Sequence, residues 1–171
     1  MDAAASHFAR LGLPPRFDLD PAQLEASYLA LAQAHHPDRA SQADVSARRA
    51  ALETSAAINE AHRVLRDPVR RAEYLCKLGG VDLDSTDRER GAPHMPATFL
   101  ADMIERREQL AQARTAGFAA LDALRERTAD EVARCFARAT TALAAQDIRA
   151  AAVALVERRY LQRLLDEIDE V

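Results

Sequence analysis

Three consecutive residues, His36, Pro37 and Asp38, combine a stiff backbone with two polar side chains suited to contacting another molecule. Proline fixes its own φ, has no N–H to donate, and keeps the preceding residue out of the helical region. A helix that leads up to His36 must therefore end there, in a rigid corner. The carboxylate at such a corner can make a charge-assisted hydrogen bond with an arginine of a partner protein. Taken alone, the three residues favour an ordinary helix end, and only their surroundings can change that interpretation.

A metal-dependent phosphohydrolase is the enzymatic alternative, with His36, Asp38, His62 and His94 as candidate ligands. Such an enzyme needs its ligands to converge in a cleft. His36 and Asp38 are expected at a loop tip, His62 on the flank of a helix, and His94 in a loop between domains. The pattern therefore favours a binding corner over a metal centre, and metal analysis of the purified protein would distinguish the two.

The composition is that of a protein that folds without covalent or metal staples. The chain has 171 residues, of which 49% are apolar, enough for one large domain or two small ones. Its two cysteines, Cys76 and Cys135, are far apart and form no Cys-x-x-Cys pair, so neither a zinc site nor a disulfide framework is indicated. We expect both to be small buried or half-buried thiols and expect no cofactor.

The charge balance and the apolar pattern restrict the class of partner and the location. The net charge is −4, so nucleic acid is not an expected partner. There is no apolar run of 18 or more residues, and residues 1–11 do not have the arrangement of a signal peptide. The expectation is a soluble protein of the cytoplasm that has no contact with a membrane.

Helix formers dominate the chain, and only five glycines, three tyrosines, five phenylalanines and no tryptophan remain as material for strands and tight turns. The predicted fold class is therefore all-α. In the first 80 residues, apolar side chains at helical spacing and Pro or Gly breaks predict four helices. Their expected spans are 4–11, 21–35, 45–66 and 69–78, with the stripe of the third formed by Leu52, Ser55, Ile58, Ala61 and Leu65. The two long helices should pack antiparallel, with the His-Pro-Asp corner at their exposed far tip.

Residues 81–95 have no sustained apolar period and contain Asp, Ser, Thr, Gly and Pro, which is typical of a connection between domains. After it, three amphipathic patterns predict a small antiparallel bundle in residues 96–171. The first helix starts at Pro96, the second runs from about Ala113 to Ala145, and the third begins after Gln146-Asp147.

Several local matches show that the sequence resembles a J-domain protein and, over nearly its whole length, the HscB family of iron–sulfur co-chaperones. Tyr28 precedes the corner at J-domain spacing. The corner and its flanking helices carry the J-domain likeness, and the Arg-Ala-Glu-Tyr-Leu segment with the appended bundle distinguishes this family from other J proteins. The matching segments are residues 7–14, 17–20, 57–61, 64–68, 71–75 and 99–110.

The resemblance implies a co-chaperone without catalysis of its own. Residues 1–80 would be an N-terminal J-domain that docks on a specialised Hsp70, HscA, and raises its ATPase rate. Residues 96–171 would be a C-terminal three-helix bundle that binds the iron–sulfur scaffold protein IscU, in a monomeric protein. The Hsp70-binding residues carried over are Tyr28, His36, Pro37, Asp38 and Arg39. The scaffold-binding residues carried over are Leu100, Ala101, Ile104, Glu105, Glu108 and Tyr160.

Two features leave alternatives open. Without the resemblance, the wide apolar stripe of residues 99–110 would more often be simply core. J-domains typically present a basic second helix to Hsp70, whereas residues 21–35 contain no Lys or Arg, so Arg16, Arg39, Arg48 and Arg49 are the nearby substitutes. Which arginines contact the Hsp70 therefore stays open. A J protein that serves a general Hsp70 with a different client is a separate alternative.

Overall fold

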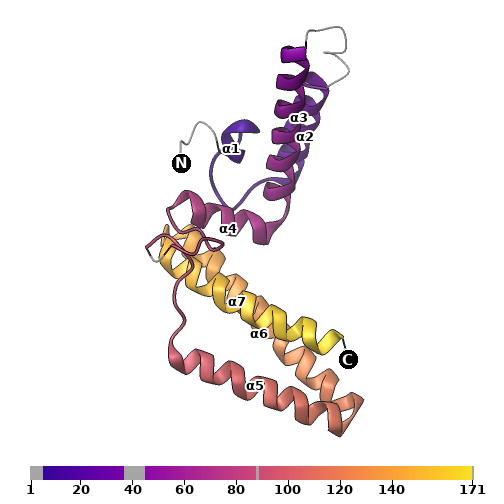
Figure 1. The fold of residues 1–171 in the computed structure, drawn as a ribbon, viewed down its shortest axis with the longest axis vertical. Coiled ribbons are helices and arrows are strands. Elements are labelled where there is room, and N and C mark those ends of the chain that lie inside the picture. Colours follow the sequence, from indigo (N-terminus) through magenta and orange to yellow (C-terminus); the bar gives the residue numbers. More distant parts are fainter. Residues whose placement is uncertain (1–5, 37–44, 88, 171) are drawn as a thin grey trace. The chain divides into compact units, whose positions relative to one another are not determined.

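The computed structural model describes residues 6–36, 45–87 and 89–170, and every regular element among them is an α-helix. The all-α prediction is confirmed. The chain divides into two compact units, residues 1–78 and 79–171. The first contains α1 (His7–Arg10), α2 (Pro21–Ala34), α3 (Val45–Arg66) and α4 (Pro68–Leu78), and the second contains α5 (Ala97–Ala116), α6 (Phe118–Ala144) and α7 (Ile148–Asp169) (Figure 1).

The helix starts in the first unit follow from side chains that accept otherwise unpaired N–H groups. The Ser6 hydroxyl accepts from the N–H of Ala9 at the start of α1, and Asp20 accepts from Ala22 at 2.9 Å at the start of α2. Asp67 accepts from Val69 at 2.8 Å, which separates α4 from α3. The expected start of the first helix at residue 4 lies outside the described residues.

The core of the first unit lies where α1 packs on α3, beside the N-terminal part of α2 that carries Leu24. The side chain of Phe8 is completely buried there, and the N–H of His7 donates to the Tyr74 hydroxyl at 2.9 Å, which attaches α4 to α1. The buried members are Phe8, Leu11, Leu13, Leu19, Leu24, Ile58, Ala61, Leu65 and Tyr74. Truncating a buried phenylalanine of this kind costs about 3–5 kcal/mol.

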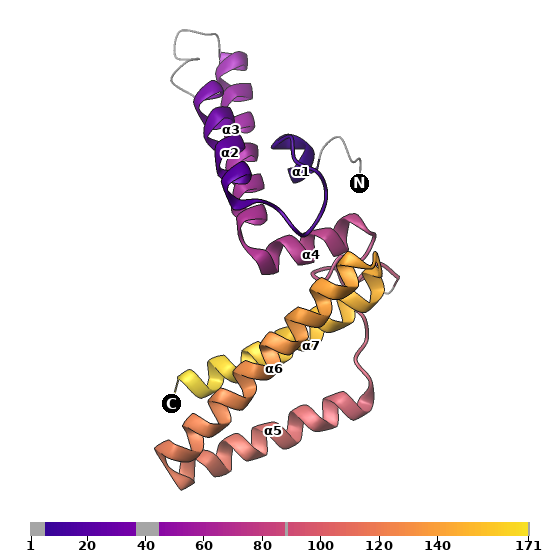
Figure 2. The ribbon, with the colours of Figure 1, turned by 180° about the vertical axis from the view of Figure 1, so that it is seen from behind.

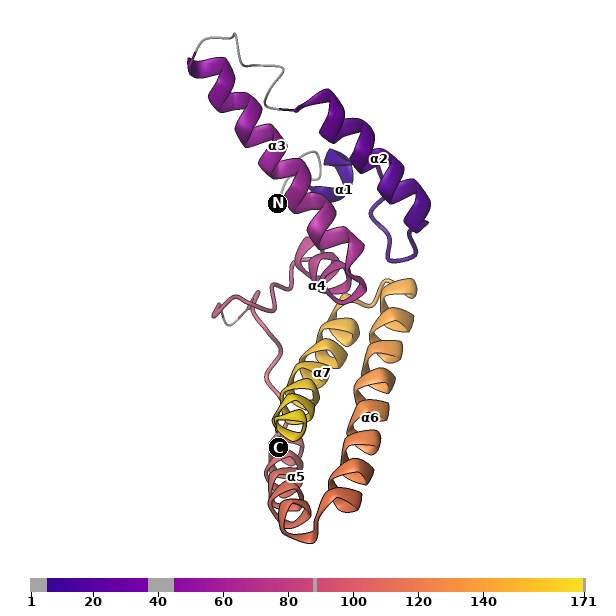
Figure 3. The ribbon, with the colours of Figure 1, turned by 90° about the vertical axis from the view of Figure 1, so that its right-hand side faces the viewer.

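The predicted stripe of α3 is wrong at its N-terminal end, because Leu52 is 57% exposed. The buried stripe begins at Ile58 and continues to Leu65. The physical reason is coverage: α1 covers the C-terminal half of α3, whereas the N-terminal half extends beyond it as part of the projecting hairpin (Figure 3). Periodicity gives the face of a helix, but it does not give the length of that face that other elements cover.

In the second unit, α6 and α7 form a long antiparallel pair, and α5 runs back along them from a tight turn (Figure 2). The sequence placed the boundary between the first two helices at about Ala113, but α5 continues to Ala116 and ends at Gly117. Gly117 has φ 100°, a conformation that favours glycine. The shared core consists of Met103, Leu110, Ala113, Leu124, Val132, Cys135, Leu161, Leu164 and Ile168.

The connection before α5 is irregular but ordered over its described residues. The N–H of Asp82 donates to the Arg90 carbonyl at 2.6 Å, and the N–H of Gly91 donates to Asp87 at 2.8 Å. A Cβ added at Gly91 would lie 2.3 Å from the Asp87 carbonyl oxygen, so this turn requires glycine. No described helix is both long enough and apolar enough to cross a membrane.

Candidate functional site

The first candidate site lies at the far end of the α2–α3 hairpin. Helix α2 ends at Ala34, the N–H of His35 donates to Leu31 at 2.9 Å as the last helical bond, and His36 is exposed. Helix α3 begins at the same end of the hairpin (Figure 3). Pro37, Asp38 and Arg39, three of the residues expected to bind Hsp70, lie outside the described residues.

Tyr28, the remaining residue expected to bind Hsp70, faces the inside of this hairpin. Its ring is stacked on the His62 ring with centroids 3.9 Å apart and planes 7° apart. Its hydroxyl donates to the Asn59 side-chain oxygen at 3.1 Å. The buried His62 in turn places Nε2 3.0 Å from a carboxylate oxygen of Glu25. These four side chains, Glu25, Tyr28, Asn59 and His62, form a clamp between α2 and α3 that the sequence alone did not reveal.

Among the described residues at this end of the hairpin, the arginines come from α3. Arg48 and Arg49 are exposed in its first turns, and Arg49 makes an ion pair with Glu53 at 2.8 Å. The outer surface of α2 instead exposes Leu29, whose side chain is 56% accessible. Because α2 carries no Lys or Arg, Arg48 is the exposed cation near the corner that forms no ion pair with a described residue. A partner's negative surface would therefore be attracted toward the α3 side of the hairpin.

The second candidate site is the outward face of α5. Leu100 is 40% exposed and Ile104 is 62% exposed, and Ala101, Glu105 and Glu108 are exposed around them. At about 100° per residue, Leu100 and Ile104 lie about 60° and 100° around the helix from Met103, which packs into the bundle together with Leu110. Ala101, Glu105 and Glu108 lie farther around, on the side away from the bundle. Leu100 and Ile104 are therefore surface residues, and the interpretation of the whole stripe as core is wrong.

Tyr160 on α7 lies beside this face. Its ring meets Phe99 edge-on at 5.6 Å, and the guanidinium of Arg163 lies 5.7 Å from the Tyr160 ring centre. Tyr160 and Leu100 both line one hollow of about 370 Å³. The fold thus brings together two of the expected scaffold-binding residues that are 60 positions apart in the chain.

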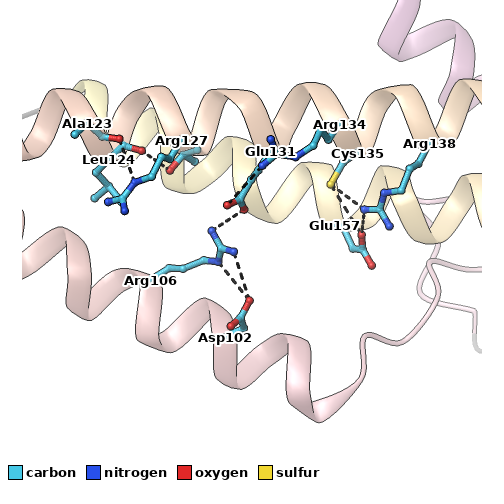
Figure 4. Close-up of polar contacts among 11 residues, drawn as sticks. Asp102, Arg106, Ala123, Leu124, Arg127, Glu131, Arg134, Cys135, Arg138 and Glu157 are labelled. Carbon is cyan, nitrogen blue, oxygen red and sulfur yellow. Dashed lines mark hydrogen bonds and ion pairs between the residues drawn. The ribbon is translucent and has the colours of Figure 1, made fainter.

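On its other side, α5 is joined to α6 by the ion pair between Arg106 and Glu131. Arg106 lies between Asp102 at 3.5 Å and Glu131 at 2.6 Å, as Figure 4 shows. Farther along α6, the Arg138 guanidinium pairs with Glu157 of α7 and donates to the Cys135 sulfur at 3.1 Å. The Arg106–Glu131 pair thus links α5 to α6, whereas the Arg138–Glu157 pair links α6 to α7.

Neither the cysteines nor the histidines form a metal site within the described residues. No group of three His, Cys, Asp or Glu side chains is placed to hold a metal ion there. Cys76 and Cys135 are both buried free thiols, as expected from the sequence. Burial raises the pKa of the Cys76 thiol to about 11, with a smaller contribution from Glu73, so this thiol is protonated at neutral pH.

Comparison with known proteins finds two family models that match this chain. Residues 6–74 match the DnaJ domain and residues 95–169 match the HSCB C-terminal oligomerisation domain. The co-chaperone protein HscB homolog of Bordetella pertussis is 47% identical over 123 residues, which cover 71% of this chain and 70% of that protein. The homolog of Neisseria meningitidis serogroup B is 34% identical over 96% of this chain and 97% of its own. The solved structure of chaperone HscB from Vibrio cholerae superposes with a TM-score of 0.76 and 30% identity over 96% of each chain.

Proposed function

This chain belongs to the HscB family of J-domain co-chaperones, and we propose that it stimulates the ATPase of an HscA-type Hsp70 and delivers an IscU-type scaffold protein to it. Such a protein promotes iron–sulfur cluster maturation and transfer without catalysing a reaction itself. We place this activity in the cytoplasm and assign it to the monomer.

One observation supports the proposal above the others: the chain presents a separate exposed surface on each of its two units. In the first unit His36 is exposed where α2 ends, and in the second Leu100 and Ile104 are exposed on α5. Exposed large apolar side chains that lie together on one helix face are typical of a protein-binding surface. A co-chaperone needs this arrangement because it has to bind a client and a chaperone at the same time.

The corner is proposed to act by discriminating between two states of the Hsp70. His36, Pro37, Asp38 and Arg39 would bind the hydrolysis-competent state more tightly than the other state, because a ligand shifts an equilibrium only through its differential affinity. A tenfold shift requires about 1.4 kcal/mol of such discrimination. Tyr28 contributes differently, since its ring and its hydroxyl are both engaged with α3. We assign it the role of positioning the hairpin that carries the corner.

The bundle is proposed to act by raising the local concentration of the client. Leu100, Ala101, Ile104, Glu105 and Glu108 on α5, with Tyr160 on α7, would hold the scaffold protein while the corner engages the Hsp70. Tethering of this kind converts the second encounter into an intramolecular one and strengthens it without any new contact. The client is thereby brought to the chaperone at the moment when hydrolysis traps it.

The corner is tested by steady-state ATP hydrolysis of the cognate Hsp70 with the scaffold protein present. His36→Gln should abolish most of the stimulation, because glutamine keeps a polar group but not the imidazole at the corner. The matched control is His35→Gln, one residue earlier and also exposed, which should stimulate like the wild type. Equal rates for His36→Gln and wild type would refute the proposed role of the corner.

The client face is tested by capture of the scaffold protein on the immobilised full-length chain. The double variant Leu100→Ala and Ile104→Ala removes the two exposed apolar side chains and should lose most of the captured scaffold. Phe118→Ala is the matched control, because Phe118 is 83% exposed at the start of α6 on the same unit. Unchanged capture by the double variant would show that the client binds elsewhere.

A further inference from the structure

The hollow beside the exposed face of α5 is built by three separate parts of the second unit. Leu100 comes from α5, Val156 and Tyr160 come from α7, and the remaining wall is the connecting segment, with Leu83 and Met95. Leu83 is only 7% exposed, so its side chain forms part of the floor. The hollow measures about 370 Å³, enough for one or two apolar side chains of another protein.

The wall formed by the connecting segment is fixed by Arg159. Its Nη1 donates to the Leu83 carbonyl at 3.1 Å and to the Asp84 carboxylate at 2.9 Å. The backbone of this segment is further closed by the bond between Asp82 and Arg90. The hollow is therefore largely preformed, which lowers the entropy cost of binding into it.

The charges around this surface are arranged with opposite signs at its two ends. Arg163 lines the hollow, is exposed, and makes no ion pair with any described residue. Toward the C-terminal side of Leu100 and Ile104, the exposed carboxylates of Glu105 and Glu108 also make no ion pair with a described residue. An apolar stretch thus runs from a cationic end at α7 to an anionic end on α5.

We propose that this surface recognises its client by charge order: an apolar side chain enters the hollow, a client carboxylate lies against Arg163, and client cations lie against Glu105 and Glu108. This inference rests on the proposed client-binding function of the bundle and adds the chemistry and direction of the bound segment. Charges at the rim of an interface fix the orientation of a partner and exclude partners of the wrong order.

The occupant is a client rather than a second copy of this chain because the exposed apolar surface is small. Leu100 and Ile104 are the exposed large apolar residues on the described part of α5. A permanent dimer interface buries a much larger and more apolar area, whereas a small apolar centre with a charged rim is typical of a partner that is bound and released. A co-chaperone has to release its client.

The experiment measures the affinity of full-length chain for the scaffold protein by calorimetry at low and at physiological salt. Arg163→Glu and Glu108→Arg each replace an attractive contact by a repulsive one, and each should weaken binding by about 3- to 10-fold at low salt. Both should also reduce the salt dependence seen with the wild type. Arg127→Glu and Glu126→Arg on exposed positions of α6 make the same changes in net charge and should leave the affinity unchanged.

If the two reversal variants bind the scaffold protein as tightly as the wild type does, the charge order is overturned. It is also overturned if the α6 controls lose as much affinity as the reversal variants, because net charge alone would then explain the effect. If the reversals instead change the sedimentation coefficient of the chain alone, the occupant is a second copy and the inference is wrong. Loss of binding in the Leu100→Ala and Ile104→Ala variant with no effect of the reversals would leave the proposed function standing and remove this inference alone.

Discussion

The clamp between Tyr28 and α3 allows the positioning role of Tyr28 to be separated from direct contact with Hsp70. Tyr28→Phe removes the hydroxyl that donates to Asn59 at 3.1 Å and keeps the ring stacked on His62. An intramolecular hydrogen bond contributes about 0.5–1.5 kcal/mol net, and partial exposure of this one places the expected loss near the lower limit, about 0.5 kcal/mol. Tyr28→Phe should therefore have nearly the same free energy of unfolding as the wild type and retain most of the ATPase stimulation.

Larger truncations should have larger effects because they remove the stack. An aromatic pair contributes about 0.5–1.5 kcal/mol beyond the area that it buries. His62 is 9% exposed and also contacts Glu25 at 3.0 Å, so His62→Ala removes packing, the stack and a hydrogen bond together. We expect a loss of about 2–4 kcal/mol from these contributions. In a double-mutant cycle with Tyr28→Ala, the coupling energy should be about 1 kcal/mol.

Two assays on the same proteins test this reasoning. Amide hydrogen exchange locates the loss of stability in α2 and α3, and ATP hydrolysis by the Hsp70 measures the effect on function. If Tyr28 acts by positioning the hairpin, variants that lower the exchange protection of α2 and α3 should lower the ATPase stimulation in proportion. If Tyr28→Phe kept full protection but lost stimulation, the hydroxyl would contact the partner directly and the positioning role would be refuted. Additive losses in the double-mutant cycle would show that the stack contributes nothing.

Three further predictions concern other parts of the chain. Burial, then the charge of Arg10, lowers the pKa of His7 below 6.5. The unfolded chain therefore binds this proton more readily than the folded chain, so stability is full above about pH 6.5 and falls as the pH drops through the folded pKa. In thermal melts, the melting temperature should decrease less between pH 7.5 and pH 5.5 for His7→Phe than for the wild type. Gly117→Ala should destabilise the bundle by about 1–3 kcal/mol in urea titrations, because φ at that position is 100°; an unchanged midpoint would contradict the strain. Cys76 should react with a thiol reagent much more slowly than a free cysteine at pH 8, since its pKa is raised to about 11; fast labelling of the folded protein would contradict this.

Much of the local structure could be predicted from the sequence because its signals are local. Asp20 followed by Pro21 marks the start of α2, and Asp67 before Pro68 marks the start of α4; both are capping patterns contained in a few residues. The end of α2 just before His36 agrees with the restriction that a following proline places on the residue before it. The turn at Gly117 was placed too early, near Ala113, because a helical pattern continues on both sides of the glycine, and a single glycine within such a pattern is a weak break.

The exposed face of α5 was predicted partly from spacing and partly from the resemblance to a family. Spacing separated Leu100 and Ile104 from Met103 and Leu110 by their angle around the helix. It did not determine whether Leu100 would be covered, because a wide apolar stripe is compatible with burial on two sides. The packing of α5 against α6 and α7 decided this, leaving Ile104 62% exposed.

The sequence by itself determined which segments are helical and where most of them begin and end, and it predicted a rigid His-Pro-Asp corner of which Pro37 and Asp38 lie outside the described residues. Only the tertiary structure decided that Tyr28 stacks on His62 and that Tyr160 shares a hollow with Leu100. The reason is the range of the interactions: caps, turns and periodicity act over a few residues, whereas these contacts join positions 34 and 60 residues apart. Their partners are set by how whole helices pack, which no local pattern specifies.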